Sequence, residues 1–200
     1  MKKFLLGVML ALTAISAQAQ LKPFVSFDYS DEEKRSDGTK NAAVNMTVGV
    51  KAPNKWEYSI KAGYSDPADP SSSKVNTQNV ELKVKKSFET GLGVYPYVSV
   101  RLGQKFNDQT QATTAKNTKH YALDLGLKVP LGMGFAVDVG SRYRNAINEN
   151  DVPAFDSVRH HATLLYDINE NHSVGLRYAQ SHGASAESKN SVRAHYTHNF

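Results

Sequence analysis

Arginine and lysine recur at every second position in several segments of this sequence, and this spacing is its most informative chemical feature. Lys83 and Lys85 show it, as do Arg142 and Arg144. Residues two apart lie on the same face of an extended chain, so these cations would gather on one side of each strand. Guanidinium groups bind carboxylates and phosphates through paired hydrogen bonds. The spacing therefore predicts a basic surface that attracts anions.

Acidic residues share this charged row but are fewer. Following the alternation along the chain gives six acids and eleven bases, a surplus of five positive charges. The acids are Asp28, Glu57, Glu81, Asp124, Asp138 and Asp167, and the bases are Lys51, Lys61, Lys83, Lys85, Arg101, Lys128, Arg142, Arg144, Arg159, Arg177 and Arg193.

The residues between these charges are apolar, which is the pattern of a strand with one apolar and one polar face. The clearest case is the run Tyr121, Leu123, Leu125, Leu127 and Val129. Turn and loop residues separate ten such segments, and the connections alternate between long and short. The segments run from about Lys22 to Ser30, Asn41 to Lys51, Trp56 to Tyr64, Val80 to Val84, Val94 to Leu102, Tyr121 to Val129, Phe135 to Tyr143, Val158 to Tyr166, Val174 to Tyr178 and Asn190 to Phe200.

This organisation predicts an all-β, closed, antiparallel up-and-down transmembrane barrel of ten strands, with twelve as the alternative if a long loop hides a hairpin. Short turns on one side and long loops on the other are typical of such barrels. The apolar rows carry no Asp, Glu, Lys or Arg near mid-strand. A lipid-facing Arg or Lys costs about 2–4 kcal/mol at the bilayer midplane, which explains the exclusion. The charged row then faces the interior.

Aromatic residues lie near the ends of the apolar rows, where rings prefer the headgroup zone of a membrane. We expect them to form two girdles. One contains Tyr29, Tyr64, Tyr121, Tyr143 and Tyr178, and the other contains Trp56, Phe135, Tyr166 and Phe200. A soluble β-sandwich would show the same alternation, but it explains neither the girdles nor an aromatic last residue.

The first 19 residues have the layout of a cleaved signal peptide. Lys2 and Lys3 precede an apolar run from Phe4 to Ile15, and Ala17-Gln18-Ala19 is a small-x-small cleavage site. We therefore expect a signal peptide over residues 1–19 and one barrel domain over 20–200. The apolar run is shorter than the roughly 20 residues of a spanning helix, and no later stretch is long and apolar enough.

Bulk composition excludes several classes of protein. The net charge of +5 falls to +3 without Lys2 and Lys3, which is too small to indicate nucleic-acid binding. Mean hydropathy is −0.48, as expected when only every second strand residue meets lipid. The sequence has no cysteine, so it has neither a disulfide framework nor a thiolate nucleophile. We expect no cofactor and no metal.

The last segment, Asn190 to Phe200, resembles the closing strand of bacterial outer-membrane β-barrels. Val192, Ala194, Tyr196 and His198 alternate with polar residues before the terminal Phe200. The resemblance implies a location in the outer membrane of a Gram-negative bacterium and contact with its lipid. It also implies recognition of this strand by the barrel-assembly machinery.

Two readings of the interior are open. Rings of like charge select counter-ions, so the bases favour a narrow porin for small anionic solutes. The segments Arg142-Tyr143-Arg144-Asn145 and Gly175-Leu176-Arg177-Tyr178 resemble parts of the oligogalacturonate-type porins, which implies passage of acidic sugars. Alternatively, long charged side chains fill a narrow barrel with ion pairs, giving a non-conducting structural protein.

Surface binding and catalysis are further alternatives. The loops from Asp31 to Lys40 and from Asp66 to Lys74 would carry binding in an adhesin-like barrel. An enzyme would need Ser181, His182, His160 and His161 to converge at the rim, but adjacent strand residues face opposite ways. The same parity places His195 and His198 on opposite faces of their strand, which argues against a metal pair. The fragment Gly132-Met133-Gly134 is a turn. We therefore expect no catalytic residues.

Overall fold

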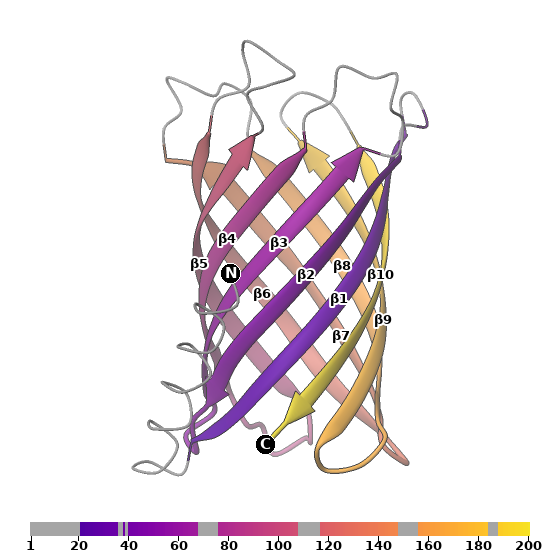
Figure 1. The fold of residues 1–200 in the computed structure, drawn as a ribbon. Coiled ribbons are helices and arrows are strands. Elements are labelled where there is room, and N and C mark those ends of the chain that lie inside the picture. Colours follow the sequence, from indigo (N-terminus) through magenta and orange to yellow (C-terminus); the bar gives the residue numbers. More distant parts are fainter. Residues whose placement is uncertain are drawn as a thin grey trace.

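The computed structural model describes residues 21–35, 38, 40–67, 76–107, 117–147, 156–183 and 188–200, and these form a closed antiparallel barrel of ten strands (Figure 1). The predicted signal peptide over residues 1–19 lies outside the described residues. The strands are β1 (Lys22–Lys34), β2 (Lys40–Lys51), β3 (Trp56–Pro67), β4 (Thr77–Ser87), β5 (Tyr95–Asn107), β6 (Thr118–Gly132), β7 (Phe135–Ala146), β8 (Ser157–Asp167), β9 (His172–Gly183) and β10 (Lys189–Asn199). The predicted fold class and strand number are confirmed.

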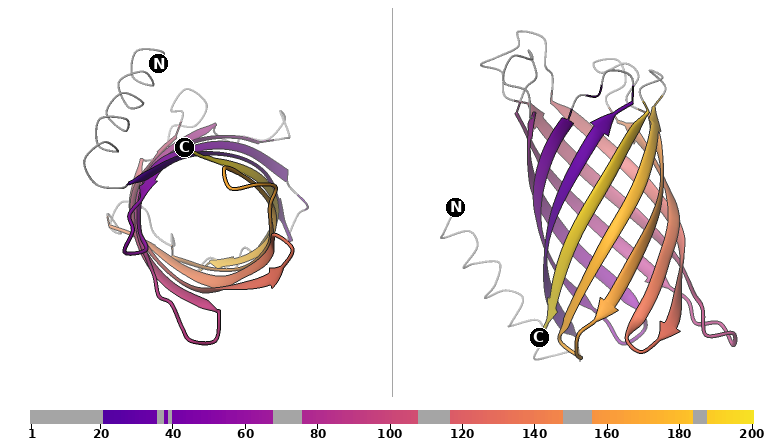
Figure 2. Two further views of the ribbon diagram at one scale, coloured as in Figure 1. Left: turned by 90° about the horizontal axis from the view of Figure 1, so that it is seen from below. Right: turned by 90° about the vertical axis from the view of Figure 1, so that its right-hand side faces the viewer.

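Each strand pairs with its neighbours in sequence, and β1 closes the sheet against β10. Their register runs from Phe24 opposite Asn199 to Lys34 opposite Lys189. Beyond the ladder, the backbone N–H of Phe200 donates to the carbonyl of Pro23 at 3.0 Å. Closure leaves no strand edge with unpaired backbone groups, which is the condition for a sheet to cross a membrane. Figure 2 shows the closed ring along the barrel axis.

The short turns lie together at one end of the barrel, where β10 also ends (Figure 1). Between β6 and β7 only Met133 and Gly134 remain outside the strands, and both have positive φ, 51° and 80°. This combination is typical of the two-residue hairpin turn whose twist matches that of the flanking strands. Met133 and Gly134 of the predicted fragment therefore form the turn, and Gly132 is the last residue of β6. Pro96 lies at the second position of β5, where a missing N–H is tolerated.

The strands reach further toward the long-loop end than the sequence suggested. The predicted loops from Asp31 to Lys40 and Asp66 to Lys74 are wrong at their edges, because β1 continues to Lys34 and β3 to Pro67. Likewise β5, β7 and β9 extend to Asn107, Ala146 and Gly183. Both faces of a strand meet water beyond the apolar zone, so these segments lack the alternation that marks a half-buried strand. The remaining loop residues lie outside the described ranges.

The two faces of the wall differ as the alternation requires. On β6, Leu123 and Leu125 are 41% and 57% exposed on the outside, whereas Asp124 between them is 3% exposed. Small side chains such as Ala122, Ala136 and Ala179 are buried on the inner face. In the described outer rows, charged residues occur only near strand ends, as at Lys86 and Lys119. No helix in the described part of the chain is long and apolar enough to span a membrane.

Candidate functional site in the barrel interior

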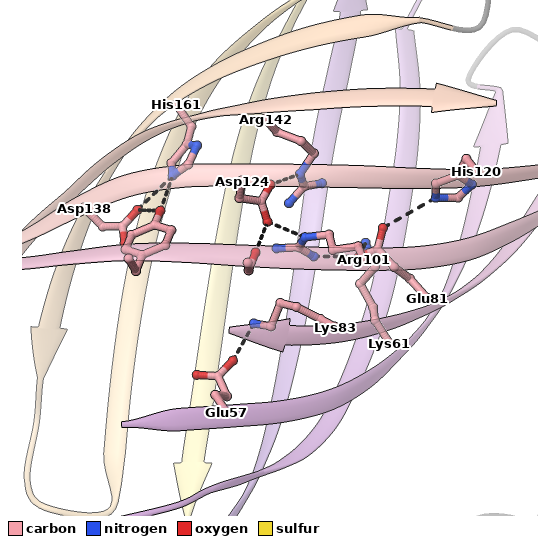
Figure 3. A network of polar contacts seen from close by, with 12 residues as sticks. Glu57, Lys61, Glu81, Lys83, Arg101, His120, Asp124, Asp138, Arg142 and His161 are labelled. Carbon is pink, nitrogen blue, oxygen red and sulfur yellow. Dashed lines mark hydrogen bonds and ion pairs between the residues drawn. The ribbon is translucent and has the colours of Figure 1, made fainter. Parts of the chain in front are cut away.

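A chain of ion pairs runs along the inner wall from β3 to β7 (Figure 3). Lys61 lies 3.4 Å from Glu81, and Glu81 accepts a hydrogen bond from Arg101 at 2.6 Å. Arg101 also reaches Asp124 at 2.5 Å, and the other oxygen of Asp124 accepts a bond from Arg142 at 2.5 Å. The chain therefore alternates three bases with two acids.

The two carboxylates of this chain are almost sealed from water. The side chains of Glu81 and Asp124 are 6% and 4% exposed, and each has a further partner. His120 Nε2 lies 3.6 Å from Glu81, and the Ser99 hydroxyl donates to Asp124 at 2.5 Å. Buried charges are stable only when they are paired and hydrogen-bonded, and both acids meet this condition. A separate pair joins Lys83 to Glu57 at 2.5 Å.

A second polar cluster joins β5, β7 and β8. His161 Nε2 lies 2.8 Å from Asp138, and the Tyr97 hydroxyl donates to the same carboxylate oxygen at 3.1 Å. Tyr97 points inward and was missed by the sequence analysis. Its ring lies over Gly126, where an added Cβ would come within 2.3 Å of Cζ. Lys85 lies 4.2 Å from the Tyr97 ring centroid, so the ring face carries a cation.

The strands β8, β9 and β10 each present one arginine to the interior. Arg159 donates to Ser181 at 2.9 Å and to Ser191 at 3.1 Å, and it pairs with Glu32 at 2.6 Å. Arg177 donates to the Thr163 hydroxyl at 2.7 Å.

Arg193, on β10, lies 3.4 Å from Asp28. Among the described residues, Arg177 differs from Arg159 and Arg193, because its partner is a hydroxyl and not a carboxylate. The carboxylates that pair with Arg159 and Arg193 both come from β1.

Two pairs of arginines are direct neighbours across the strands. Arg142 stands opposite Arg159 on β7 and β8, and Arg177 stands opposite Arg193 on β9 and β10. All four line one small cavity with His161, Ala179 and Ser191, which we call the arginine cavity. Like charges directly opposite each other destabilise a sheet. The sequence nevertheless places two such pairs around the same space.

The remaining predicted interior residues follow their strand parity. Lys51 donates to Asn199 at 2.6 Å and lies 5.2 Å from the centroid of the inward ring of Phe24. Lys128 and Arg144 are partly buried on the inner side of β6 and β7. Asp167, at the last position of β8, is exposed at the short-turn rim.

Four charged residues on the inner face were missed because they fell in predicted loops: Glu32, Lys34, Lys105 and Lys189. Glu32 is the partner of Arg159, and Lys105 stands opposite Asn79 on the β4–β5 ladder. Continuing the parity of Asp28 and Ser30 would have placed Glu32 inside. With these four residues added to the predicted row, it holds seven acids and fourteen bases, so its surplus of positive charges rises from five to seven.

The residues considered for catalysis do not converge. Ser181 accepts from Arg159 on the inner side, whereas His182 is exposed and lies 3.0 Å from Ser188. His161 binds Asp138 inside, while His160 lies on the outer wall, 2.7 Å from Ser141. Within the described ranges, no group of three or more His, Cys, Asp or Glu side chains is arranged to hold a metal.

The predicted girdle residues lie on the outer face. Tyr121 and Tyr143 contact edge to face with centroids 6.3 Å apart, and Phe135 and Tyr166 are 4.6 Å apart. Trp56 stacks with Tyr58 at the start of β3. Tyr29, Tyr64, Tyr178 and Phe200 are likewise exposed. Their contact with membrane headgroups remains a prediction.

Solved outer-membrane barrels share this fold at low sequence identity. An outer-membrane channel from Pseudomonas putida has a TM-score of 0.58 at 9% identity, covering 90% of this chain and 95% of that one. The NanC porin has a TM-score of 0.54 at 11% identity, covering 86% and 98%. The chain has the fold of the small outer-membrane β-barrels. The translocator domain of the autotransporter NalP from Neisseria meningitidis has a TM-score of 0.51 at 11% identity, covering 90% and 88%.

The structural neighbours of this barrel also include the KdgM porin in complex with disordered oligogalacturonate, with a TM-score of 0.44 at 12% identity, covering 88% and 99%. No protein-family model matches the sequence, and the comparison with curated proteins found no match. Likeness at these identities concerns the fold, so the activity has to be argued from the interior.

Proposed function

We propose that this barrel is a passive channel for small anionic solutes. The observation that carries the proposal is the arginine cavity, where Arg142 stands opposite Arg159 and Arg177 opposite Arg193. Two like-charge pairs around one space are unfavourable in an empty barrel. An anion passing beside them along the interior would reduce the repulsion, and guanidinium groups suit carboxylates and phosphates in particular.

The ion pairs inside the barrel leave some positive charge without a carboxylate partner. In the chain from Lys61 to Arg142, three bases share two acids, so one positive charge is not neutralised. On the facing strands, Arg159 and Arg193 have carboxylate partners and Arg177 has a hydroxyl. A passing anion could bind to this excess without breaking any ion pair. Weak binding at several such positions permits both entry and release.

The proposal includes a location and two partners. The protein would be exported through the signal peptide of residues 1–19 and embedded in outer-membrane lipid through its apolar rows. The barrel-assembly machinery would read the strand that ends in Phe200. The NanC porin and the Pseudomonas channel are named for transport, which is in keeping with a channel here.

A specific observation favours a second candidate, a filled structural barrel that conducts nothing. Glu81 and Asp124 are almost completely buried, and Arg101 bridges them with bonds of 2.6 and 2.5 Å. Buried ion pairs of this kind would stabilise the barrel wall, and long side chains can fill a narrow barrel. The two candidates differ in whether solutes cross.

Liposome swelling separates the candidates. Vesicles containing the refolded barrel would be exposed to glucuronate, glucose and glucosamine, which have similar sizes and different charges. The proposed channel admits glucuronate fastest and glucosamine slowest. Absence of swelling with all three solutes would favour the filled barrel, and faster entry of glucosamine than glucuronate would contradict the anion preference.

A further inference from the structure

Four of the seven histidines lie in two pairs on the outer wall, one pair toward each end of the barrel. His172 and His198 form the pair at the short-turn end, on β9 and β10. We propose that His172 and His198 bind a divalent transition-metal ion. The site lies outside the interior and is independent of transport.

The strand register places the two imidazoles together. His198 is directly opposite His172 in the β9–β10 ladder, and both are on the outer face by strand parity. Directly opposed side chains start about 4.5–5.5 Å apart at Cβ, so they can reach one ion without moving the backbone. The ring centroids are 4.6 Å apart and the two Nδ1 atoms are 3.4 Å apart.

The spacing of the nitrogens suits a shared metal. Zinc–nitrogen bonds are about 2.0–2.1 Å long, so two ligands of a tetrahedral ion lie about 3.3–3.4 Å apart. The observed Nδ1–Nδ1 distance of 3.4 Å matches this bite. An ion between the two nitrogens would keep open positions toward solvent, which water can fill.

Two contacts compete for the same nitrogen, Nδ1 of His172. His172 Nδ1 also lies 2.6 Å from the Tyr196 hydroxyl. A ring nitrogen has either one lone pair or one proton in the ring plane. His172 Nδ1 can therefore form a good hydrogen bond with Tyr196 or with His198, but not with both. A cation that accepts both imidazole lone pairs ends the competition for His172 Nδ1, and the Tyr196 hydroxyl can then donate to a water bound to the ion.

Neighbouring rings hold the histidines in place. The His172 ring stacks on Tyr196 with centroids 5.9 Å apart, and the Phe200 ring packs edge-on against His198 at 4.4 Å. Such contacts orient ligands before the ion arrives. Imidazole nitrogens suit zinc, copper and nickel, with copper(II) bound most tightly, whereas calcium and magnesium prefer oxygen ligands.

The second histidine pair provides a matched control. His160 and His182 lie on the same wall, but His160 is opposite Gln180, so the two histidines are diagonal and their centroids are 6.4 Å apart. Each Nδ1 has its own serine partner, Ser141 at 2.7 Å and Ser188 at 3.0 Å. This pair has neither the spacing nor the competing contacts, so we expect no shared ion there.

Titration of the untagged, refolded barrel with Zn²⁺ by calorimetry tests the proposal. We expect saturable binding that His172→Ala and His198→Ala each weaken by about tenfold or more, while His160→Ala changes it by less than about twofold. With Cu²⁺, electron paramagnetic resonance should show coupling of the ion to two imidazole nitrogens. His198→Ala should remove the coupling to one of them.

Heat-dependent gel migration verifies that each variant is folded, and His198→Gln is a milder substitute if an alanine variant fails. Absence of saturable Zn²⁺ binding by the wild-type barrel would overturn the proposal. So would an equal loss of binding on His160→Ala, or an unchanged isotherm when both His172 and His198 are replaced.

Discussion

Arg177 and Arg193 stand directly opposite each other on β9 and β10, with both side chains on the inner face of the barrel. Arg193 lies 3.4 Å from Asp28, whereas Arg177 binds the Thr163 hydroxyl. A sheet selected for stability alone would separate two such cations or place an acid between them. Under the proposed function, an anion passing along the interior would reduce the repulsion within this pair.

Replacing Arg177 with glutamine tests this expectation. Arg177→Gln removes one charge of the opposed pair, and glutamine can still donate to Thr163. We expect the free energy of unfolding to stay the same or rise by up to about 1 kcal/mol, while the preference for anions decreases. Urea unfolding and bilayer selectivity measure the two effects.

The control for this substitution is Lys86→Gln, which removes a positive charge from the outer face, where Lys86 lies over the Trp56 ring. It should leave selectivity unchanged. If Arg177→Gln lowers the free energy of unfolding and leaves ion selectivity unchanged, the role of Arg177 is structural only.

Asp124→Asn should have the opposite effects. Asp124 is shared by Arg101 and Arg142, so its removal leaves two guanidinium groups facing each other without a carboxylate between them. Breaking a buried ion pair costs about 3–5 kcal/mol, and we expect a loss of this order in urea unfolding. Any barrel that still folds should prefer anions more strongly.

Ser99→Ala removes only the hydroxyl's hydrogen bond to the Asp124 carboxylate and should cost about 1.5–3 kcal/mol. If Asp124→Asn costs no more than this control, the ion-pair chain does not stabilise the wall.

A charge on the outer face should be tolerated only near the ends of the barrel. Leu125 is exposed in the middle of β6, and Leu131 is exposed near its end. In lipid vesicles, Leu125→Arg should lower the free energy of unfolding by about 2–4 kcal/mol and Leu131→Arg by about 0–1 kcal/mol. Equal costs for the two substitutions would show that this face does not meet hydrocarbon.

The single tryptophan, Trp56, reports on the girdle at the short-turn end. Aromatic rings prefer the headgroup zone, so its fluorescence should be quenched more by lipids brominated near the headgroup than by lipids brominated near the chain end. Leu123→Trp in a Trp56→Phe background should show the reverse order. The same order for both positions would contradict the depth assigned to Trp56.

Strand parity explains how much of this structure could be predicted. Tyr121 to Val129 alternates so regularly that the inner and outer residues of β6 follow from the sequence alone, and the turn at Met133 and Gly134 fixes its register with β7. The alternation fades at the outer ends of the strands, where both faces meet water. Glu32 was therefore assigned to a loop, although it pairs with Arg159.

Register across long loops could not be predicted. Parity places Arg177 and Arg193 on the inner face, but only the ladder shows that they are directly opposite. The same holds for His172, which precedes the predicted segment beginning at Val174, and for its partner His198. Contacts between residues distant in sequence depend on register, which long polar loops do not specify.

The reversal potential of the wild-type barrel in a planar bilayer, under an asymmetric KCl gradient, tests the account most directly. We expect stepwise insertion of conducting units and a reversal potential displaced toward the chloride equilibrium potential. A displacement toward the potassium equilibrium potential, or a folded barrel that never conducts, would contradict the account.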